Sequence, residues 1–317
     1  MGTVTAPLQG RNLLSSADLT RAEYERVFAT AAELKREFRE TRRHAAQPLG
    51  GRNVALIFEK QSLRTRVTFE AGLNQQGGHA LHLGEGIGFG VRESVADIAH
   101  NLERWIDAIV IRTFDHSVAT ELASETGIPV FNALTDDEHP FQALADLLAM
   151  REHFGDLAGR VLTFIGDGNN VYHSLALAGA ILGMEIRLAH PAGFGPHADI
   201  IAAAERLAAS SGGKIVVGRN PLELAPGSDA LYTDVWVSMG QEAQSHARVA
   251  AFAGYCVDSS LLELAGPEAV AMHCLPAHRG QEITAEVLDG PHSIALDQAE
   301  NRLHVQKAFL VESLGRE

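Results

Sequence analysis

Short apolar runs alternate with amphipathic stretches from residue 53 to the end of the chain. The run "NVALIF" (Asn53–Phe58) is continuously apolar, as expected of a strand buried on both faces of a parallel sheet. "AIVIR" (Ala108–Arg112) and "IPVFN" (Ile128–Asn132) have the same character. Helices are predicted between and after these strands at "TRVTFEAGLNQQGG", "SVADIAHNLERW", "VATELASETG" and "HPFQALADLLAM".

A second series of the same kind follows a seam near Arg151–Arg160. Its predicted strands are "RVLTFIG", "EIRLAH", "KIVVG", "DALYTDVW" and "AVAMHC". Its predicted helices are "NNVYHSLALAGAILG" and "HADIIAAAERLAASSGG". We therefore predict an α/β protein with two doubly wound domains, residues 1–150 and 151–298, each a parallel sheet flanked by helices. The periodicity of "AENRLHVQKAFLVESL" does not say which domain receives this last helix, and we expect residues 299–317 to pack back on the first.

Composition adds a few limits to this picture. With 317 residues, 46% of them hydrophobic, the chain can bury a core that needs no disulfides. Its two cysteines, Cys256 and Cys274, are too few for a disulfide framework and fit a reducing compartment. We expect neither a signal peptide nor a membrane span, because no stretch has the required apolar length. The formal net charge of −14 argues against nucleic acid as a partner, but a local basic pocket can still bind a small anion.

Ligands of doubly wound folds bind beyond the carboxyl ends of the strands, so the loops there are the most informative. "SLRTR" follows a predicted strand and opens a helix, where Ser62, Arg64, Thr65 and the first free N–H groups would bind an anion such as phosphate. It lacks the glycines and the Lys-Ser/Thr pair of a Walker loop. A solvated basic helix start is an equally good interpretation of this loop alone.

Two further loops of the first series carry donors. Arg112 ends the strand "AIVIR" and would face a cleft, although a surface arginine paired with an aspartate is the simpler interpretation. In "HPFQ", His139 stands before a proline at a helix start and Gln142 lies in the first turn, so both could point into a pocket. Taken singly, a capping histidine and a surface glutamine are more common.

In the second series, "GDGNN" lacks the third glycine of a dinucleotide-binding loop, and no acid ends the next strand. Its two asparagines suit a zwitterionic ligand, or they merely form a turn. In "TDVWVSMG", Asp234 and Ser238 could hold an ammonium and a carboxylate, unless the aspartate forms an Asx turn.

"MHCLPAHRG" poses the question of a Cys–His pair or a metal site. Three clustered candidates, His273, Cys274 and His278, are few for zinc, and no HExxH occurs. Strand alternation predicts that the side chains of His273 and Cys274 point to opposite faces, which excludes this histidine as a base for the thiol and leaves His278 as the candidate base. We expect a turn at a strand end, with free carbonyls before Pro276 and the thiol lining a pocket.

In this order and spacing, "SLRTR", "HPFQ", "GDGNN", "DVWVSMG", "HCLP" and "AENR" resemble the ornithine branch of the aspartate/ornithine transcarbamoylase family. The resemblance runs from about Asn53 to the C-terminal helix. "HCLP" and "SMG" together are specific to the ornithine branch, whereas the aspartate branch shares only the earlier motifs.

The resemblance implies transfer of a carbamoyl group from carbamoyl phosphate to the δ-amine of L-ornithine, which gives L-citrulline and phosphate by direct attack. It implies neither a covalent enzyme intermediate nor a metal or organic cofactor. The first domain would bind carbamoyl phosphate and the second ornithine, with the active site in the cleft between them. The family is typically a homotrimer, or a multiple of trimers, and acts in the cytoplasm in arginine biosynthesis.

By the same resemblance each loop receives a role. The phosphate would be held by Ser62, Leu63, Arg64, Thr65 and Arg112. The carbamoyl group would be held by His139, Gln142, Arg302 and the main-chain carbonyls of Cys274 and Leu275. The ornithine backbone groups would be held by Asn170, Asp234, Ser238 and Met239. Catalysis would rest on Arg64, Arg112, His139, Asp234, Cys274 and Arg302.

Two positions depart from the family pattern. Leu63 replaces a hydroxyl residue of S-T-R-T-R, and Gly88 stands where members often carry a His or Gln that reaches into the neighbouring subunit. The alternatives are a transcarbamoylase that uses putrescine or an acylated ornithine, and a catalytically silent homologue that binds carbamoyl phosphate. The sequence does not separate the anabolic from the catabolic direction.

Overall fold

The computed structural model describes residues 8–84, 88–89, 91–237 and 245–316. The chain divides into two units, Met1–Ala145 with Asn301–Glu317 (unit 1) and Asp146–Glu300 (unit 2). Both changes of unit occur inside helices, within α5 (Pro140–Phe154) and α12 (Ala295–Leu314). Among the described helices, none is both long and apolar enough to cross a membrane.

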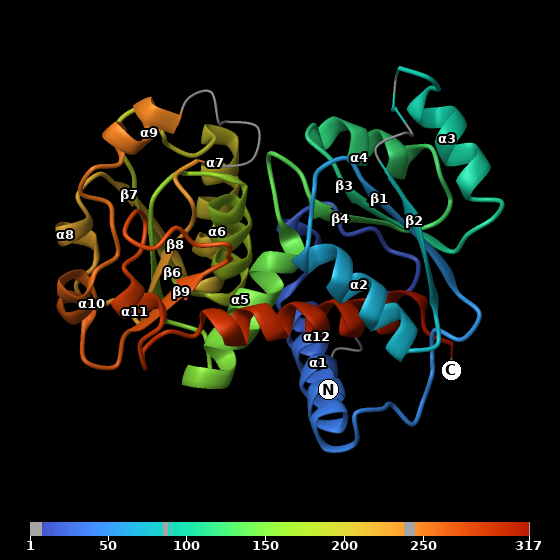
Figure 1. Ribbon diagram of the computed structural model, residues 1–317, viewed down its shortest axis with the longest axis horizontal. Helices are drawn as coiled ribbons and strands as arrows, with labels where there is room; N and C mark the ends of the chain where they lie inside the picture. Colours follow the sequence, from blue (N-terminus) through green and yellow to red (C-terminus); the bar gives the residue numbers. More distant parts are fainter. Residues whose placement is uncertain (1–7, 85–87, 90, 238–244, 317) are drawn as a thin grey trace. The chain divides into compact units, whose positions relative to one another are not determined.

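Unit 1 contains a parallel sheet in the order β2-β1-β3-β4, with α3 and α4 over one face and α1, α2 and α12 over the other (Figure 1). Its elements are α1 (Arg21–Thr41), β1 (Asn53–Phe58), α2 (Arg64–Gln75), β2 (His79–Leu83), α3 (Val95–Leu102), β3 (Ala108–Arg112), α4 (His116–Ser124) and β4 (Val130–Leu134). Helices on both faces explain why the central strands are apolar throughout.

The bounds of β1 and β3 coincide with the predicted strands, because both strands are buried along nearly their whole length. β4 begins two residues later than the predicted run at Ile128. The edge strand β2 was not predicted, since its partly exposed sequence "HALHL" has no long apolar run. α1 was also missed, although the buried residues Tyr24, Val27, Phe28 and Ala31 follow the helical spacing i, i+3, i+4, i+7.

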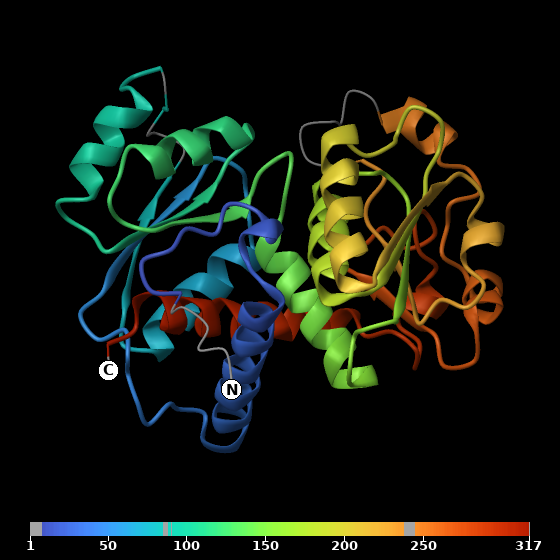
Figure 2. The same ribbon diagram turned by 180° about the vertical axis from the view of Figure 1, so that it is seen from behind.

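Unit 2 contains a parallel sheet in the order β7-β6-β5-β8-β9. Helices α6 and α7 lie on one side of it, and α8, α10 and α11 lie on the other (Figures 1 and 2). Its remaining elements are β5 (Val161–Ile165), α6 (Asn170–Leu182), β6 (Glu185–Ala189), α7 (Ala198–Ser211), β7 (Lys214–Gly218), α8 (Pro221–Leu224), β8 (Ala230–Thr233), α9 (Ser245–Ala251), α10 (Ser259–Ala265), β9 (Val270–His273) and α11 (Ala285–Leu288).

Two strands of unit 2 are shorter than the sequence predicted. β8 ends at Thr233 and β9 at His273, whereas the predicted runs continued to Trp236 and Cys274. The two strands are parallel neighbours, and Thr233 pairs with His273. The residue after each strand end, Asp234 and Cys274, therefore leaves the sheet at the same edge and at the same level.

Candidate active site

The start of α2 is a helix N-terminus without a side-chain cap. Leu63 occupies the N-cap position and accepts no cap hydrogen bond with its side chain, which is 74% exposed. Ser62 and Arg64 are half-buried, and Thr65 is buried. Because the first N–H groups of a helix need an acceptor, a bound anion can supply what the leucine cannot. Leu63 has no hydroxyl to offer, but the backbone N–H groups at the start of α2 are still available to an anion.

Arg302, on α12, joins two of the predicted loops within unit 1. Its Nη2 donates to Thr65 Oγ1 over 2.7 Å, and its Nη1 donates to Gln142 Oε1. All three side chains are almost fully buried. Residues separated by up to 237 positions in the sequence thus form one hydrogen-bonded group.

Arg112 ends β3 and is 6% exposed. Within the part of the chain that the structure describes, its buried Nε has no hydrogen-bond partner. Burial, and then the charges of Arg302 and Arg64, lower the pKa of Arg112 to about 10. The guanidinium is still charged at neutral pH, so it is a buried cation that faces other cations. An anion between these groups would relieve both the desolvation and the repulsion.

His139 stands directly before α5, whose first residue is Pro140. Burial, and then the charges of Arg302, Arg112 and Lys60, hold the pKa of His139 well below its ordinary value. The imidazole is therefore neutral at pH 7 and carries a single N–H. A neutral imidazole among cations can donate a hydrogen bond to a polarised carbonyl oxygen without adding a further charge.

Lys60 is a cation that was not among the residues predicted from the sequence. It follows β1, is 8% exposed, forms an ion pair with Asp136 and lies 4.2 Å from the centre of the Phe114 ring. Its charge contributes to the low pKa of His139. Its position two residues before "SLRTR", at the carboxyl end of a strand, was the available signal. We call Lys60, Arg64, Arg112 and Arg302, with His139 and Gln142, the arginine cluster.

In unit 2, Asp234 is the centre of a second group. Its Oδ1 accepts a hydrogen bond from Cys274 Sγ (2.9 Å), and its Oδ2 accepts one from Asn169 Nδ2 (2.8 Å). We call these three residues the acid–thiol cluster. The pairing of β8 with β9 brings the acid and the thiol together, although 40 positions separate them in sequence.

The thiol of Cys274 is held in its protonated form. Burial, and then the charge of Asp234 and the hydrogen bond to it, raise the pKa of Cys274 well above its ordinary value. The thiolate is the nucleophilic form of cysteine, so this environment disfavours covalent attack by the sulfur. The thiol instead donates a hydrogen bond to Asp234.

Of the two asparagines in "GDGNN", Asn169 contacts Asp234, and it also caps α6 by accepting hydrogen bonds from two backbone N–H groups. The predicted ligand, Asn170, is the first residue of α6 and is half-buried. The sequence alone does not assign these roles, because either asparagine could have been the cap. Ser238 and Met239, also predicted to bind ornithine, lie outside the described residues.

His273 lies closer to Cys274 than strand alternation predicted. One ligand atom each of Asp234, His273 and Cys274 lies within 4.8 Å of the other two. The alternation rule does not apply here, because β9 ends at His273 and Cys274 is outside the strand. The three residues nevertheless fit a metal poorly, because a cysteine binds a metal as the thiolate and a histidine binds it through a ring nitrogen that is free of other partners. The protonated thiol of Cys274 donates a hydrogen bond to Asp234, the N–H of Leu275 donates to Nδ1 of His273, and Nε2 of His273 is paired with Glu282.

Gly88 has a positive φ of 61°, and its carbonyl accepts hydrogen bonds from the N–H groups of Val91 and Arg92. A left-handed backbone favours glycine over a residue with a Cβ atom. The departure from the family pattern at this position is therefore accompanied by a local turn that suits glycine.

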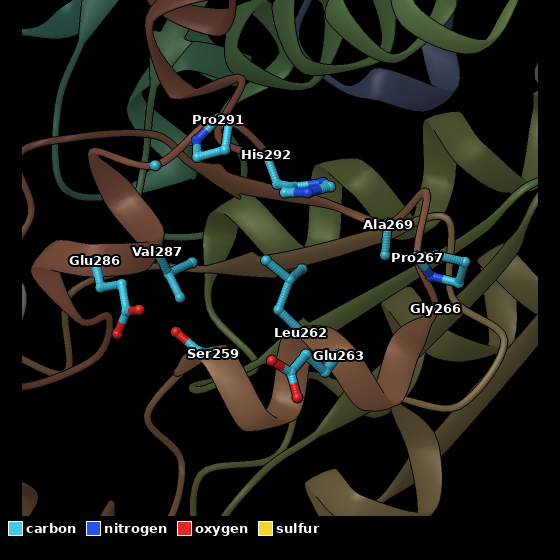
Figure 3. A pocket seen from close by; sticks show the side chains of 11 residues that line it. Ser259, Leu262, Glu263, Gly266, Pro267, Ala269, Glu286, Val287, Pro291 and His292 are labelled. Atoms are coloured by element: carbon cyan, nitrogen blue, oxygen red, sulfur yellow. The ribbon is translucent and has the colours of Figure 1, made fainter.

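A surface hollow lies elsewhere in unit 2, between α10 and α11 (Figure 3). It is lined by the exposed side chains of Glu263, Glu286 and His292 around the more buried Leu262 and Val287. None of the predicted site residues lines it.

Comparison with known proteins matches both units to one family. Residues 11–152 match the family model described as aspartate/ornithine carbamoyltransferase, carbamoyl-P binding domain. Residues 158–312 match the model for the Asp/Orn binding domain of the same family. Together the two matches cover nearly the whole chain.

Relatives and solved structures agree with the two domain matches. The chain is 49% identical over 314 residues to the ornithine carbamoyltransferase of Thermosynechococcus vestitus, with 98% of each protein covered. It is 47% identical over 313 residues to that of Anoxybacillus flavithermus, covering 98% of the chain and 99% of the relative. The solved ornithine carbamoyltransferase from Pyrococcus furiosus superimposes with a TM-score of 0.94 at 41% identity, covering 98% of this chain and 99% of that one.

Proposed function

The chain belongs to the aspartate/ornithine carbamoyltransferase family, and from this premise we propose how its residues transfer the carbamoyl group of carbamoyl phosphate to the δ-amine of L-ornithine. The products are L-citrulline and phosphate. The observation that carries the proposal is the arginine cluster, in which burial, Arg302 and Arg64 together lower the pKa of Arg112. Buried like charges of this kind are stabilised by an anionic substrate.

The phosphate group of carbamoyl phosphate is bound by the start of α2 and by Arg112. Ser62, Thr65 and the backbone N–H groups from Leu63 onward supply neutral donors, and Arg64 and Arg112 supply charge. The uncapped N-terminus of α2 and the buried guanidinium of Arg112 support these roles.

The carbamoyl group is polarised by His139, Gln142 and Arg302. Negative charge develops on its oxygen as the amine attacks, and donors already in place stabilise that charge. The neutral His139 donates one N–H, and Arg302 donates from a guanidinium that Thr65 and Gln142 hold in orientation. The carbamoyl NH₂ donates to the main-chain carbonyls of Cys274 and Leu275.

Ornithine is bound through its backbone groups by Asn170, Asp234, Ser238 and Met239. Its δ-amine attacks as the neutral amine, and the C–N bond forms as the C–O bond to phosphate breaks. The leaving phosphate accepts the proton of the amine, so no protein base and no covalent intermediate are required. The raised pKa of Cys274, caused by burial and Asp234, supports a thiol that aligns the amine rather than attacking.

Assembly and location follow from the family in the same way. A homotrimer, or a multiple of trimers, is supported by exposed apolar side chains of unit 1, including Leu81 on the edge strand β2, Val67 and Trp105. A cytoplasmic role in arginine biosynthesis is supported by two cysteines that are both free thiols. Sedimentation equilibrium at micromolar concentration tests the assembly, and a monomer would contradict it.

The direct test is product formation from carbamoyl phosphate with ornithine, putrescine, aspartate and N-acetylornithine in parallel. Citrulline from ornithine alone is the expected result. A product with another amine but none with ornithine would change the substrate assignment. Binding of carbamoyl phosphate without any product would favour a silent homologue.

The role of the thiol is tested by Cys274→Ser. We expect the fold to be kept and turnover to fall by about tenfold, because serine retains a donor to Asp234 but differs in length and acidity. Steady-state kinetics with both substrates measures the effect. Mass-spectrometric capture of a carbamoyl thioester on Cys274 in the unmodified enzyme would overturn the direct-attack mechanism.

A further inference from the structure

Two ionisable side chains are fully buried beneath the turn that carries Cys274 and Leu275. His273 and Glu282 are both 0% exposed, and His273 Nε2 lies 3.3 Å from Glu282 Oε1. Buried ionisable groups are unfavourable unless they are paired. The mechanism proposed above uses neither side chain, so their burial requires a separate explanation.

The hydrogen bonds determine the tautomer of His273. The backbone N–H of Leu275 donates to its Nδ1 over 2.8 Å, so that this nitrogen carries no proton. The proton of a neutral ring then lies on Nε2, which faces the carboxylate of Glu282. The imidazole is therefore an acceptor on the side of the turn and a donor on the side of the acid. Since its basic nitrogen is occupied by Leu275, it cannot also be the base for the thiol.

Glu282 holds the turn at a second point. Its Oε1 also accepts a hydrogen bond from the backbone N–H of His278. Burial by itself would raise the pKa of Glu282, but the hydrogen bonds from His273 and His278 outweigh it and lower that pKa. The carboxylate is thus ionised and accepts from both ends of the segment between residues 273 and 278.

The start of the turn is held from beneath as well. The backbone N–H of His273 donates to Gln298 Oε1 (2.9 Å), and Gln298 donates to Asp146 (2.8 Å). Tyr232 donates to the other oxygen of Asp146 over 2.9 Å. Gln298, Asp146 and Tyr232 are all fully buried, so they fix the end of β9 within the core of unit 2.

The backbone of Leu275 explains why so much support is needed. Its φ is 58°, in the left-handed region that residues with a Cβ atom rarely adopt. Such a conformation persists only where the surrounding structure holds it. The side chain of Leu275 packs against the apolar core of unit 2, and its backbone N–H is held by the hydrogen bond to His273.

We propose that His273 and Glu282 are positioning residues for carbamoyl transfer. Glu282 orients the imidazole of His273, and Nδ1 of this imidazole holds Leu275 in the left-handed conformation. That conformation directs the carbonyls of Cys274 and Leu275 toward the carbamoyl NH₂. The last step of this inference rests on the proposed function, because only that function assigns the two carbonyls to the substrate. Neither side chain touches the reacting atoms.

A matched pair of substitutions at His273 distinguishes the role of Nδ1 from that of Nε2. In His273→Asn the amide oxygen replaces Nδ1 and can still accept from Leu275, whereas in His273→Gln the amide reaches toward Glu282 and the Nδ1 acceptor is lost. We expect kcat to fall about 10- to 100-fold in His273→Gln and by no more than about fivefold in His273→Asn. The KM for ornithine should stay within about threefold in both, because Asp234 is unchanged. Equal losses in the two variants, or the reverse order, would overturn the proposal.

Two measurements on the protein without substrate keep the test independent of activity. Imidazole ¹⁵N spectra should show His273 protonated on Nε2 only, and a proton on Nδ1 would overturn the proposal. Amide exchange at Leu275 should become about tenfold faster in His273→Gln and stay near the parent rate in His273→Asn. Glu282→Gln, in which a neutral amide replaces the carboxylate that accepts from His273 and His278, is the milder variant should His273→Gln fail to fold: amide exchange at Leu275 should become about threefold faster, and an unchanged rate would remove Glu282 from the proposal. Exchange results as expected in an enzyme inactive with ornithine would refute the proposed function and leave the backbone role intact.

Discussion

The two clusters differ in the sign of their electrostatic environment. In unit 1, the charges acting on Arg112 and His139 are those of other cations, and the pKa of each is lowered, first by burial and then by these neighbours. In unit 2, burial and Asp234 raise the pKa of Cys274. One cluster thus favours an added anion and the other favours an added cation or a neutral donor. This difference supports the proposed roles, in which the arginine cluster binds a phosphate and the acid–thiol cluster binds an amine.

Two buried arginines, Arg248 in unit 2 and Arg112 in unit 1, also differ in how their charge is compensated. Arg248 in unit 2 is buried, forms an ion pair with Asp167 and lies 4.7 Å from the centre of the Phe194 ring. Arg112 in unit 1 is about equally buried, but the ionisable groups that act on it are arginines. A buried cation with an anionic partner stabilises the fold, whereas a buried cation beside other cations is stabilised when an anionic ligand binds.

The largest expected effect comes from removing a cation of the arginine cluster. Arg64→Ala should lower kcat/KM for carbamoyl phosphate about 10²- to 10³-fold, because one preorganised charged donor is lost. Steady-state kinetics, with calorimetric titration of inorganic phosphate, measures it. Arg66→Ala is the matched control, since Arg66 lies on the same helix but is exposed and pairs with Glu70 over 2.9 Å.

The control should change kcat/KM by no more than about twofold, as exposed helical ion pairs contribute little. An Arg64→Ala enzyme that binds phosphate as tightly as the parent would remove the arginine cluster from the phosphate site.

An intermediate effect is expected in the acid–thiol cluster of unit 2, from Asp234→Asn. The KM for ornithine should rise about tenfold or more, while the KM for carbamoyl phosphate stays within about threefold. Besides burial, the charge of Asp234 raises the pKa of Cys274, and the same change removes that charge, so iodoacetamide should alkylate this cysteine about tenfold faster at pH 8.5. Mass spectrometry reads each cysteine separately.

Asp258→Asn is the control for that experiment, because Asp258 contributes to the raised pKa of Cys256 and caps α10. It should leave the alkylation rate of Cys274 unchanged. Unchanged alkylation of Cys274 in Asp234→Asn would mean that burial alone raises the pKa of the thiol.

The smallest effects are on stability, and they have opposite pH dependence in the two clusters. The pKa of His139 is lowered from 6.5, so the unfolded chain binds more protons and the folded state loses stability as pH falls below about 6.5. The pKa of Cys274 is raised from 9.0, so stability is lost as pH rises above about 9. In a plot of unfolding free energy against pH, His139→Asn should flatten the acid limb below about pH 6.5, and Cys274→Ser should flatten the alkaline limb above about pH 9. Each slope should change by about 1 kcal/mol per pH unit.

Urea unfolding of the three proteins at a series of pH values measures these limbs. A parent enzyme with the same acid limb as His139→Asn would contradict the lowered pKa of this histidine. An alkaline limb unchanged by Cys274→Ser would contradict the raised pKa of the thiol.

Much of the fold could be predicted from the chain because its central strands are buried on both faces. The continuous apolar runs of β1 and β3 follow from that burial, and their predicted bounds match. Elements at the periphery were harder: β2 is partly exposed, and α1 carries many charges around a narrow apolar stripe. Exposed positions are weakly constrained by packing, so their sequences resemble those of loops.

The chemistry-bearing loops were predictable for a different reason. Parallel strands end at one edge of a sheet, so a polar residue placed after an apolar run is brought to that edge. This rule located Arg112, Asp234 and Cys274. It did not separate Asn169 from Asn170, and it did not find Lys60 or Glu282, because hydrogen-bond direction and burial depend on partners from other segments.

The sequence by itself determined the fold class, the order of the motifs and the types of donor at each strand end, because periodicity and residue chemistry are local properties. Only the tertiary structure decided the charge state of each group. Burial, and then the charges of Arg302 and Arg112, lower the pKa of His139, and burial, and then Asp234, raise the pKa of Cys274; these charged groups come from distant positions in the chain. A pKa responds to desolvation and to nearby charge, and both exist only once the chain has folded.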